Sequence, residues 1–317
     1  MRDGELGYLL DAKSPLVGGR GPSGPWDIFV SAFNDTERVQ RTFDKADARR
    51  KFWWLLPEYR YTASDAVPSG AFTALGSSEA ELVDAGLITS GVVPGCGRVC
   101  IDITGFLPQH ILYLLRRLPL IGAHEFDMVY TEPESYSERA NTAFSLGDVD
   151  VVRQVAGFGG LHSPDMANDV LVVGVGYDHN LIGRVVLDKE SARLIQLQCF
   201  PSLSADMYNE SLLRLDRLSI SSHGRVDEQL FFAAANDPFV TAAVLSGAVK
   251  AVRRAQPLTN LYLSPLATKP QVLGFGLYYL KECMGTATSI IYPFSALHSR
   301  GSSTGTGRTW VYPITIP

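Results

Sequence analysis

Short runs of consecutive apolar residues alternate along this chain with longer segments in which apolar residues recur every three or four positions. Runs of the first kind are typical of strands in a parallel sheet, and segments of the second kind are typical of amphipathic helices. In the first half, the pattern predicts strands over 28–33, 51–59, 98–105 and 126–133. Helices are predicted over 36–47, 77–88 and 108–118. We expect the strand over 51–59 to be internal and covered on both faces.

The same alternation continues in the second half of the chain. Strands are predicted over 170–177, 193–201, 260–265, 289–294 and 309–316. Helices are predicted over 181–188, 236–252 and 270–282. Strands that alternate with helices predict parallel sheets with helical crossovers. The expected fold class is therefore α/β, with two tandem Rossmann-like lobes built on mostly parallel sheets.

Two alignments of the chain with itself predict that these lobes are a pseudo-duplication. Residues 107–138 align without a gap on residues 269–300, and residues 26–43 align on residues 169–186. Because both alignments keep the same order along the chain, we expect two homologous lobes with a ligand site shared between them.

The expected domain boundaries follow from these alignments and from composition. They are a mobile N-terminal arm over 1–25, a first lobe over 26–138, a connector with an edge strand or hairpin over 139–168, and a second lobe over 169–317.

Composition and charge narrow the classes of function. The 317 residues are 46% hydrophobic and 19% charged, as in soluble globular proteins, and the net charge is −5. An acidic chain disfavours a broad nucleic-acid-binding surface, so a small ligand, including an anionic one, fits better. No apolar run reaches the roughly 18 residues of a membrane span, so we expect no membrane association and a cytoplasmic location. The spacing of the Cys and His residues predicts no metal site, and no cofactor is assigned.

Polar and glycine residues follow several of the predicted strands. Ligands of open parallel sheets bind beyond the carboxyl ends of the strands, where loops and helix N-termini meet. In the first lobe this rule selects Asn34, Asp35, Thr104, Gly105 and Glu132. In the second lobe it selects Gly174, Gly176, Asp178, His179, Thr268 and Lys269.

The carboxylates at this edge admit two interpretations. Asp35 and Asp178 occupy the same turn in the two alignments, where each can cap the following helix. Alternatively, both line a common cleft and bind ribose hydroxyls or act as an acid/base pair, with His179 as a general base. Glu132, which precedes Pro133 after a predicted strand, is the leading acidic candidate if the protein is an enzyme.

Two glycine-rich segments also admit two interpretations each. The sequence GVGYDH over 174–179 resembles the start of a dinucleotide fingerprint, although His179 stands where the third glycine would be. Its glycines otherwise serve a tight turn. Residues 299–308 form either a hairpin tip or an anion-binding loop with Arg300 or Arg308.

The segment VCIDITGFLPQHILYLL, in which Asp102–Gly105 end a strand ahead of a helix, resembles the signature of CRISPR-associated Rossmann-fold (CARF) domains. The second lobe carries the Thr268–Lys269–Pro270 part of that signature. Phe106 and Leu107 stand where the family has polar residues. The resemblance implies a sensor of a nucleotide second messenger in antiviral defence, with ligand contacts from Thr104, Gly105, Thr268 and Lys269. Since no effector module is attached, the output would require a separate protein.

Three functions remain open on the sequence alone. The first is a binding protein or sensor for a nucleotide-derived ligand that acts with a protein effector or complex partner. The second is a nucleotide- or nucleoside-processing enzyme, a hydrolase or glycosyl transferase, that uses Glu132, Asp178 and His179. The third is a structural subunit of a complex.

Overall fold

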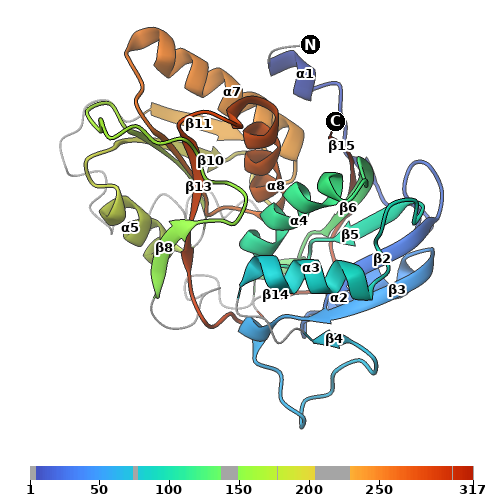
Figure 1. Cartoon of the computed structure of the whole chain (residues 1–317). Helices are drawn as coiled ribbons and strands as arrows, with labels where there is room; N and C mark the ends of the chain where they lie inside the picture. The colour runs from blue at the N-terminus through green and yellow to red at the C-terminus, as the bar shows by residue number, and fades with distance from the viewer. Residues whose placement is uncertain are drawn as a thin grey trace. The chain divides into compact units, whose positions relative to one another are not determined.

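The computed structural model describes residues 5–73, 78–136, 149–176, 178–203, 229–301 and 303–316. The chain divides into two compact units. The first unit comprises Asp11–Leu146 and Leu297–Pro317, and the second comprises Met1–Leu10 and Gly147–Ala296. Each unit contains one large sheet and the helices that pack against it (Figure 1).

The sheet of the first unit is mostly parallel. Its strands are β1 (Ser14–Pro15), β2 (Trp26–Ala32), β3 (Ala48–Leu55), β4 (Phe72–Thr73), β5 (Val99–Asp102), β6 (Glu125–Thr131) and β15 (Thr309–Thr315). Their order is β1-β15-β6-β5-β2-β3-β4. The strands from β6 to β4 are parallel to one another, whereas β15 is antiparallel to both β6 and β1. A separate small sheet pairs β7 (Ser135–Tyr136) with β14 (Ser303–Thr304).

Local sequence signals set the helices of the first unit. These helices are α2 (Glu37–Lys45), the short 3₁₀ helix η1 (Pro57–Tyr59), α3 (Glu79–Thr89) and α4 (Pro108–Leu120). Ser78 and Glu81 form a capping box at the start of α3. Pro108 occupies the first position of α4, where a backbone N–H would have no partner within the helix, so its absence costs no hydrogen bond.

The sheet of the second unit is parallel except at one edge. Its strands are β8 (Val151–Gln154), β9 (Val170–Val175), β10 (Arg193–Cys199), β11 (Gln229–Ala233), β12 (Leu261–Pro265) and β13 (Thr288–Phe294). Their order is β11-β10-β9-β12-β13-β8, and only β8 is antiparallel to its neighbour. The edge strand expected in the connector is β8.

The helices of the second unit are α1 (Glu5–Tyr8), α5 (His179–Asp188), α7 (Pro238–Ala255) and α8 (Lys269–Tyr278). A single π-helical turn, η4 (Tyr279–Cys283), continues α8. Side chains of Asp178, Asp237 and Thr268 accept hydrogen bonds from backbone N–H groups in the first turns of α5, α7 and α8. No helix in the described residues is both long and apolar enough to cross a membrane.

The predicted α/β class and the mostly parallel sheets are confirmed. In both sheets the earliest parallel strand is central, the next two lie on one side of it, and the last two lie on the other. An antiparallel strand, β15 or β8, follows at the same edge. This shared strand order agrees with the two sequence alignments, whereas descent from a duplicated ancestor stays a prediction.

The contact division differs from the expected boundaries at both ends of the chain. Residues 297–317, expected in the second lobe, belong to the first unit because β15 pairs with β6 along its whole length. Figure 1 shows β15, in red, beside β6. The expected N-terminal arm is also divided, since α1 packs on α7 and β1 pairs with β15.

The prediction that the strand over 51–59 is internal and covered on both faces is confirmed for its apolar part. The strand observed there, β3, begins earlier, at Ala48, where Arg49 and Arg50 are exposed, and ends at Leu55. It lies between β2 and the two-residue strand β4. Adjacent side chains of a strand point to opposite faces: Trp53 stacks on Phe43 of α2 at 3.8 Å, and the Trp54 ring packs on Gly86 of α3.

Candidate functional site

The carboxyl ends of β2 and β5 lie side by side in the first unit, with Ser31 opposite Asp102. From this pair of strands the sheet extends to β3 on one side and to β6 on the other. Such a point of diverging connections is where open α/β sheets bind ligands. Gly105 packs directly on the carbonyl of Ala32, and a Cβ atom at position 105 would overlap that oxygen. Only glycine allows the loops after β2 and β5 to approach so closely.

Beneath this edge lies a fully buried polar network. Asp102 accepts hydrogen bonds from Ser31 Oγ at 2.8 Å and from the backbone N–H of Thr104 at 3.0 Å. The Thr104 hydroxyl in turn accepts a bond from the Thr131 N–H at 3.0 Å. Ser31, Asp102, Thr104 and Thr131 are all 0% exposed. Hydrogen bonds of the Asp102–Gly105 segment therefore link β2, β5 and β6, and the Thr104 hydroxyl is buried within this network.

The residues after β2 shape the loop ahead of α2. The Asn34 side-chain oxygen accepts bonds from the N–H and the hydroxyl of Thr36, at 3.0 and 2.6 Å. Thr36 is the N-cap of α2, and its own side chain makes no capping bond. Asp35 is exposed and accepts a bond from the Tyr61 hydroxyl at 3.1 Å. Neither Asn34 nor Asp35 caps α2 directly. The Asn34 side chain instead closes a turn with Thr36, the residue just before the helix.

Arg38, in the first turn of α2, is a buried cation at the same edge. It is 5% exposed. One guanidinium nitrogen donates to the Thr131 carbonyl at 2.6 Å and lies 3.5 Å from the Tyr130 hydroxyl, while Nε has no partner. Within the part of the chain that the structure describes, no carboxylate forms an ion pair with Arg38.

The sequence analysis missed Arg38. A signal was present, because a basic residue in the first turn of a helix faces the positive end of the helix dipole and is disfavoured there. A cation kept at that position, in the helix that follows the central strand of a mostly parallel sheet, is a candidate for anion binding.

Tyr59, at the end of η1, lies close to the polar groups of this edge. Its hydroxyl donates to the Gly105 carbonyl at 2.8 Å. Burial raises the pKa of Tyr59 to about 12, against the opposing effects of a hydrogen bond with Asn34 and the charge of Arg38, while the charge of Glu58 adds to the rise. The Tyr59 hydroxyl is therefore protonated at neutral pH and lies within the electrostatic range of both Arg38 and Glu58.

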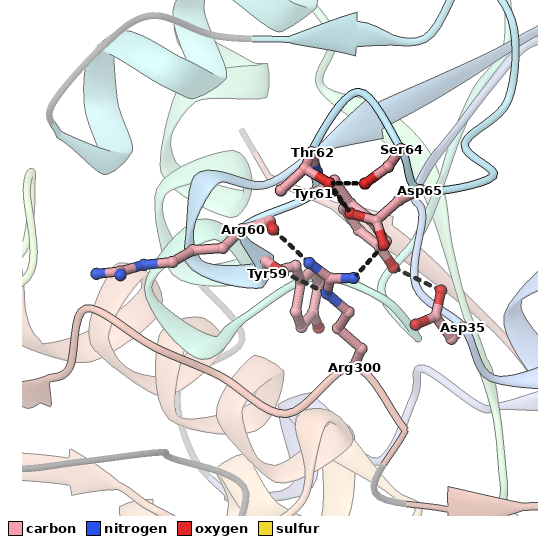
Figure 2. Close-up of polar contacts among 8 residues, drawn as sticks. All are labelled: Asp35, Tyr59, Arg60, Tyr61, Thr62, Ser64, Asp65 and Arg300. Atoms are coloured by element: carbon pink, nitrogen blue, oxygen red, sulfur yellow. Dashed lines mark hydrogen bonds and ion pairs between the residues drawn. The ribbon is translucent and has the colours of Figure 1, made fainter.

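Arg300 fastens the loop that follows Tyr59 (Figure 2). Its Nε donates to the Tyr59 carbonyl at 2.5 Å, a second nitrogen donates to the Arg60 carbonyl, and a third pairs with Asp65 at 2.9 Å. The guanidinium also lies 4.2 Å from the centre of the Tyr61 ring. Arg300 is thus committed to the protein's own loop, which argues against its predicted alternative role in an anion-binding loop over 299–308.

Replacement of Arg300 by alanine is expected to loosen residues 59–65 locally. Hydrogen bonds that involve a charged group contribute about 1.5–3 kcal/mol each, so amide hydrogen exchange in this loop should accelerate by at least tenfold. Hydrogen exchange measured by mass spectrometry checks this, with exposed Arg308→Ala as the control from the same segment. Equal exchange in the two variants would mean that the loop is held by other contacts.

Glu132 follows β6 as expected. Its Oε1 accepts a hydrogen bond from the Trp310 indole N–H, on β15, at 2.8 Å. The carboxylate thus joins the parallel part of the sheet to the antiparallel strand at its edge. A catalytic role for Glu132 stays a prediction.

The predicted residues of the second unit also lie at the carboxyl ends of strands. Gly174 lies in the last two residues of β9 and Gly176 directly follows the strand, where a Cβ atom would overlap the Leu266 carbonyl oxygen. This contact matches the one made by Gly105, although the glycine here follows the central strand. Tyr177, within the fingerprint-like segment, lies outside the described residues.

Capping accounts for several of these residues in the second unit. An Asp178 oxygen accepts the Leu181 N–H at 3.4 Å, so the capping interpretation is the one the structure supports for this carboxylate. His179 and Lys269 are the first residues of α5 and α8. The Thr268 hydroxyl accepts the Gln271 N–H at 3.4 Å and donates to the Ala235 carbonyl.

The second unit also holds the thiol Cys199 at this end of its sheet. Its Sγ lies 3.3 Å from the side-chain oxygen of Gln271. Burial raises the pKa of Cys199 to about 12, so the thiol is protonated at neutral pH and is a poor nucleophile. Across the described ranges, no group of three or more His, Cys, Asp or Glu side chains is arranged to hold a metal ion.

Comparison with known proteins gave no family for this chain. No family model matches the sequence, and a search of curated proteins found no significant match.

Proposed function

We propose that this protein binds a nucleotide-derived ligand at the carboxyl edge of the first unit's sheet and passes the signal to a separate partner protein. The observation that carries the proposal is Arg38, a buried guanidinium without a carboxylate partner among the described residues. A buried charge is strongly unfavourable unless a counter-charge accompanies it. An anionic ligand would supply that counter-charge.

The surroundings of Arg38 favour a phosphate over other anions. A guanidinium binds phosphate oxygens through paired N–H donors, and its Nε is available for such a bond. The N-terminal turn of α2 adds backbone N–H groups and the positive end of a helix dipole. Phosphates of nucleotides are the ligands that such edges of α/β sheets most often bind.

The resemblance of Asp102–Gly105 to CARF domains supports the sensor class and a place in antiviral defence. In this chain, we infer that Thr104 and Gly105 act by setting the geometry of the edge, since Thr104 is fully buried and Gly105 permits the contact with Ala32. Direct contact with the ligand would then fall to Arg38 and to backbone N–H groups.

A ligand screen tests this proposal. The purified protein is melted in the presence of cyclic oligonucleotides, linear nucleotides, NAD and nucleosides, and each hit is analysed by mass spectrometry. A ligand at 100 times its Kd should raise Tm by on the order of 5 °C, and a sensor should return the ligand intact. Cleavage of the ligand would instead indicate the nucleotide-processing enzyme.

The variant Arg38→Gln links the response to the site. We expect affinity for the hit to fall about 10- to 100-fold, because one charge-assisted contact is lost. The control is Arg41→Gln on the same helix, where the side chain is exposed and pairs with Glu37 at 3.0 Å. Unchanged affinity in Arg38→Gln, or no stabilising anion in the whole screen, would overturn the proposal.

A further inference from the structure

A second group of polar side chains lies at the same edge of the first unit, with Gln109 and His110 buried and Glu58 partly exposed. Glu58 is in η1, and Gln109 and His110 are in the first turn of α4. The Gln109 side-chain nitrogen donates to Glu58 Oε1 at 3.2 Å, and His110 Nε2 lies 3.4 Å from the same oxygen. Gln109 is 2% exposed and His110 is 1% exposed. One carboxylate oxygen therefore joins three side chains.

Each of these side chains also carries a buried polar atom without a partner. The atoms are Glu58 Oε2, Gln109 Oε1 and His110 Nδ1. Their chemical character follows from the contacts already described. A carboxylate oxygen accepts hydrogen bonds, and Gln109 presents its oxygen because its nitrogen is used by Glu58.

The state of His110 completes the set. Burial lowers the pKa of His110 below its usual value, so the ring is neutral at pH 7. The nitrogen beside a carboxylate carries the single proton, which places it on Nε2 and leaves Nδ1 as an acceptor. The cluster thus offers three acceptors against at most one remaining donor, the second N–H of the Gln109 amide. Buried acceptors are satisfied in native proteins by a donor group.

The position of the cluster connects it to the proposed ligand site. Glu58 directly precedes Tyr59, and the charges of both Glu58 and Arg38 act on the Tyr59 hydroxyl. That hydroxyl binds the Gly105 carbonyl, four residues before Gln109. A cation that suits phosphate and a set of acceptors that suits a donor group therefore occur at the same edge of one sheet.

We propose that Glu58, Gln109 and His110 recognise the amino group of the ligand's nucleobase, so that the site selects bases with an exocyclic amine over their keto counterparts. This inference rests on the proposed function. A carboxylate, an amide oxygen and an imidazole nitrogen attract N–H donors and repel a carbonyl oxygen. Sites that bind a polar group in this way discriminate strongly against analogues that lack it.

Matched pairs of nucleotides test the inference. AMP and IMP share ribose and phosphate and differ by an amino group in place of a keto group, as do CMP and UMP. Isothermal titration of the full chain should show AMP and CMP binding at least about tenfold more tightly than IMP and UMP. In Glu58→Gln, which introduces a donor, this preference should fall toward unity.

Two further variants keep the test decisive. Glu37→Gln changes an exposed carboxylate on α2 and should leave the preference intact. If Glu58→Gln does not fold, Gln109→Met removes one acceptor at similar volume and should also weaken the preference. Equal binding within both pairs would overturn the inference, and the three acceptor atoms would then be satisfied by ordered water. The proposed function would still stand in that case. Failure of all four nucleotides to bind would also overturn the inference, while the proposed function would still be decided by the wider ligand screen.

Discussion

Replacement of Gly105 by alanine is expected to destabilise the first unit by about 3 kcal/mol or more. The new methyl group would overlap the Ala32 carbonyl oxygen, which is backbone at the end of the central strand β2 and cannot rotate away. Relief requires separation of the loops after β2 and β5. That movement would also disturb the Tyr59 bond to the Gly105 carbonyl. The midpoint of urea unfolding measures the loss.

The control for this variant is Gly301→Ala. Among the described residues, apart from its chain neighbours, no heavy atom lies within 4 Å of the position of its Cβ, so the methyl group meets open space. We expect a change within about 0.5 kcal/mol, as for ordinary surface substitutions. If Gly105→Ala were as stable as Gly301→Ala, the close approach of the two loops would be disproved, and with it the geometry of the candidate site.

Replacement of Arg38 by methionine is expected to weaken ligand binding about 100-fold, the upper end of the range for Arg38→Gln because methionine donates no hydrogen bond, while leaving the ligand-free protein at least as stable. A buried cation without a counter-charge carries an uncompensated desolvation cost on the order of several kcal/mol, which methionine removes. Methionine has a similar length and adapts to irregular space. Stability and binding would then change in opposite directions, as is typical of functional sites.

Unfolding in urea without ligand, followed by titration with the hit from the ligand screen, measures both effects. The matched control is Arg41→Met, which removes an exposed ion pair with Glu37 and should alter neither quantity by more than about 0.5 kcal/mol. A loss of stability greater than 1 kcal/mol in Arg38→Met, on the order of one net hydrogen bond, would identify Arg38 as a structural residue that holds the Thr131 carbonyl.

Much of the fold follows from local patterns in the sequence. Apolar runs predicted β2, β5, β9 and β12, and capping by Asp178 was one of the two interpretations offered for the start of α5, because these signals act within a few residues. The partner of a strand is a different matter. The sequence pattern of β15 suits any sheet edge, and its pairing with β6 is decided by contacts about 180 residues apart in the chain.

The candidate site shows the same limit. The rule for carboxyl ends of strands located Asn34, Thr104 and Gly105, yet it could not show that Thr104 is buried in a network of hydrogen bonds. The burial of Arg38 could not be predicted either, because charged residues in an amphipathic helix normally lie on its solvent-facing side. The three unpaired acceptors of Glu58, Gln109 and His110 could not be predicted either, because they depend on contact between Glu58 and the first turn of α4, about 50 residues later in the chain.

The return of β15 to the first sheet has a consequence for biosynthesis. When residues 1–146 have left the ribosome, β6 can pair with β5 but still lacks β15. The backbone N–H and C=O groups on that side of β6 therefore stay unpaired throughout translation of the second unit. The first unit can complete its sheet only after residues 309–315 emerge. A ribosome that stalls in the second unit would therefore leave a nascent chain with an unprotected strand edge, a target for chaperones and for aggregation.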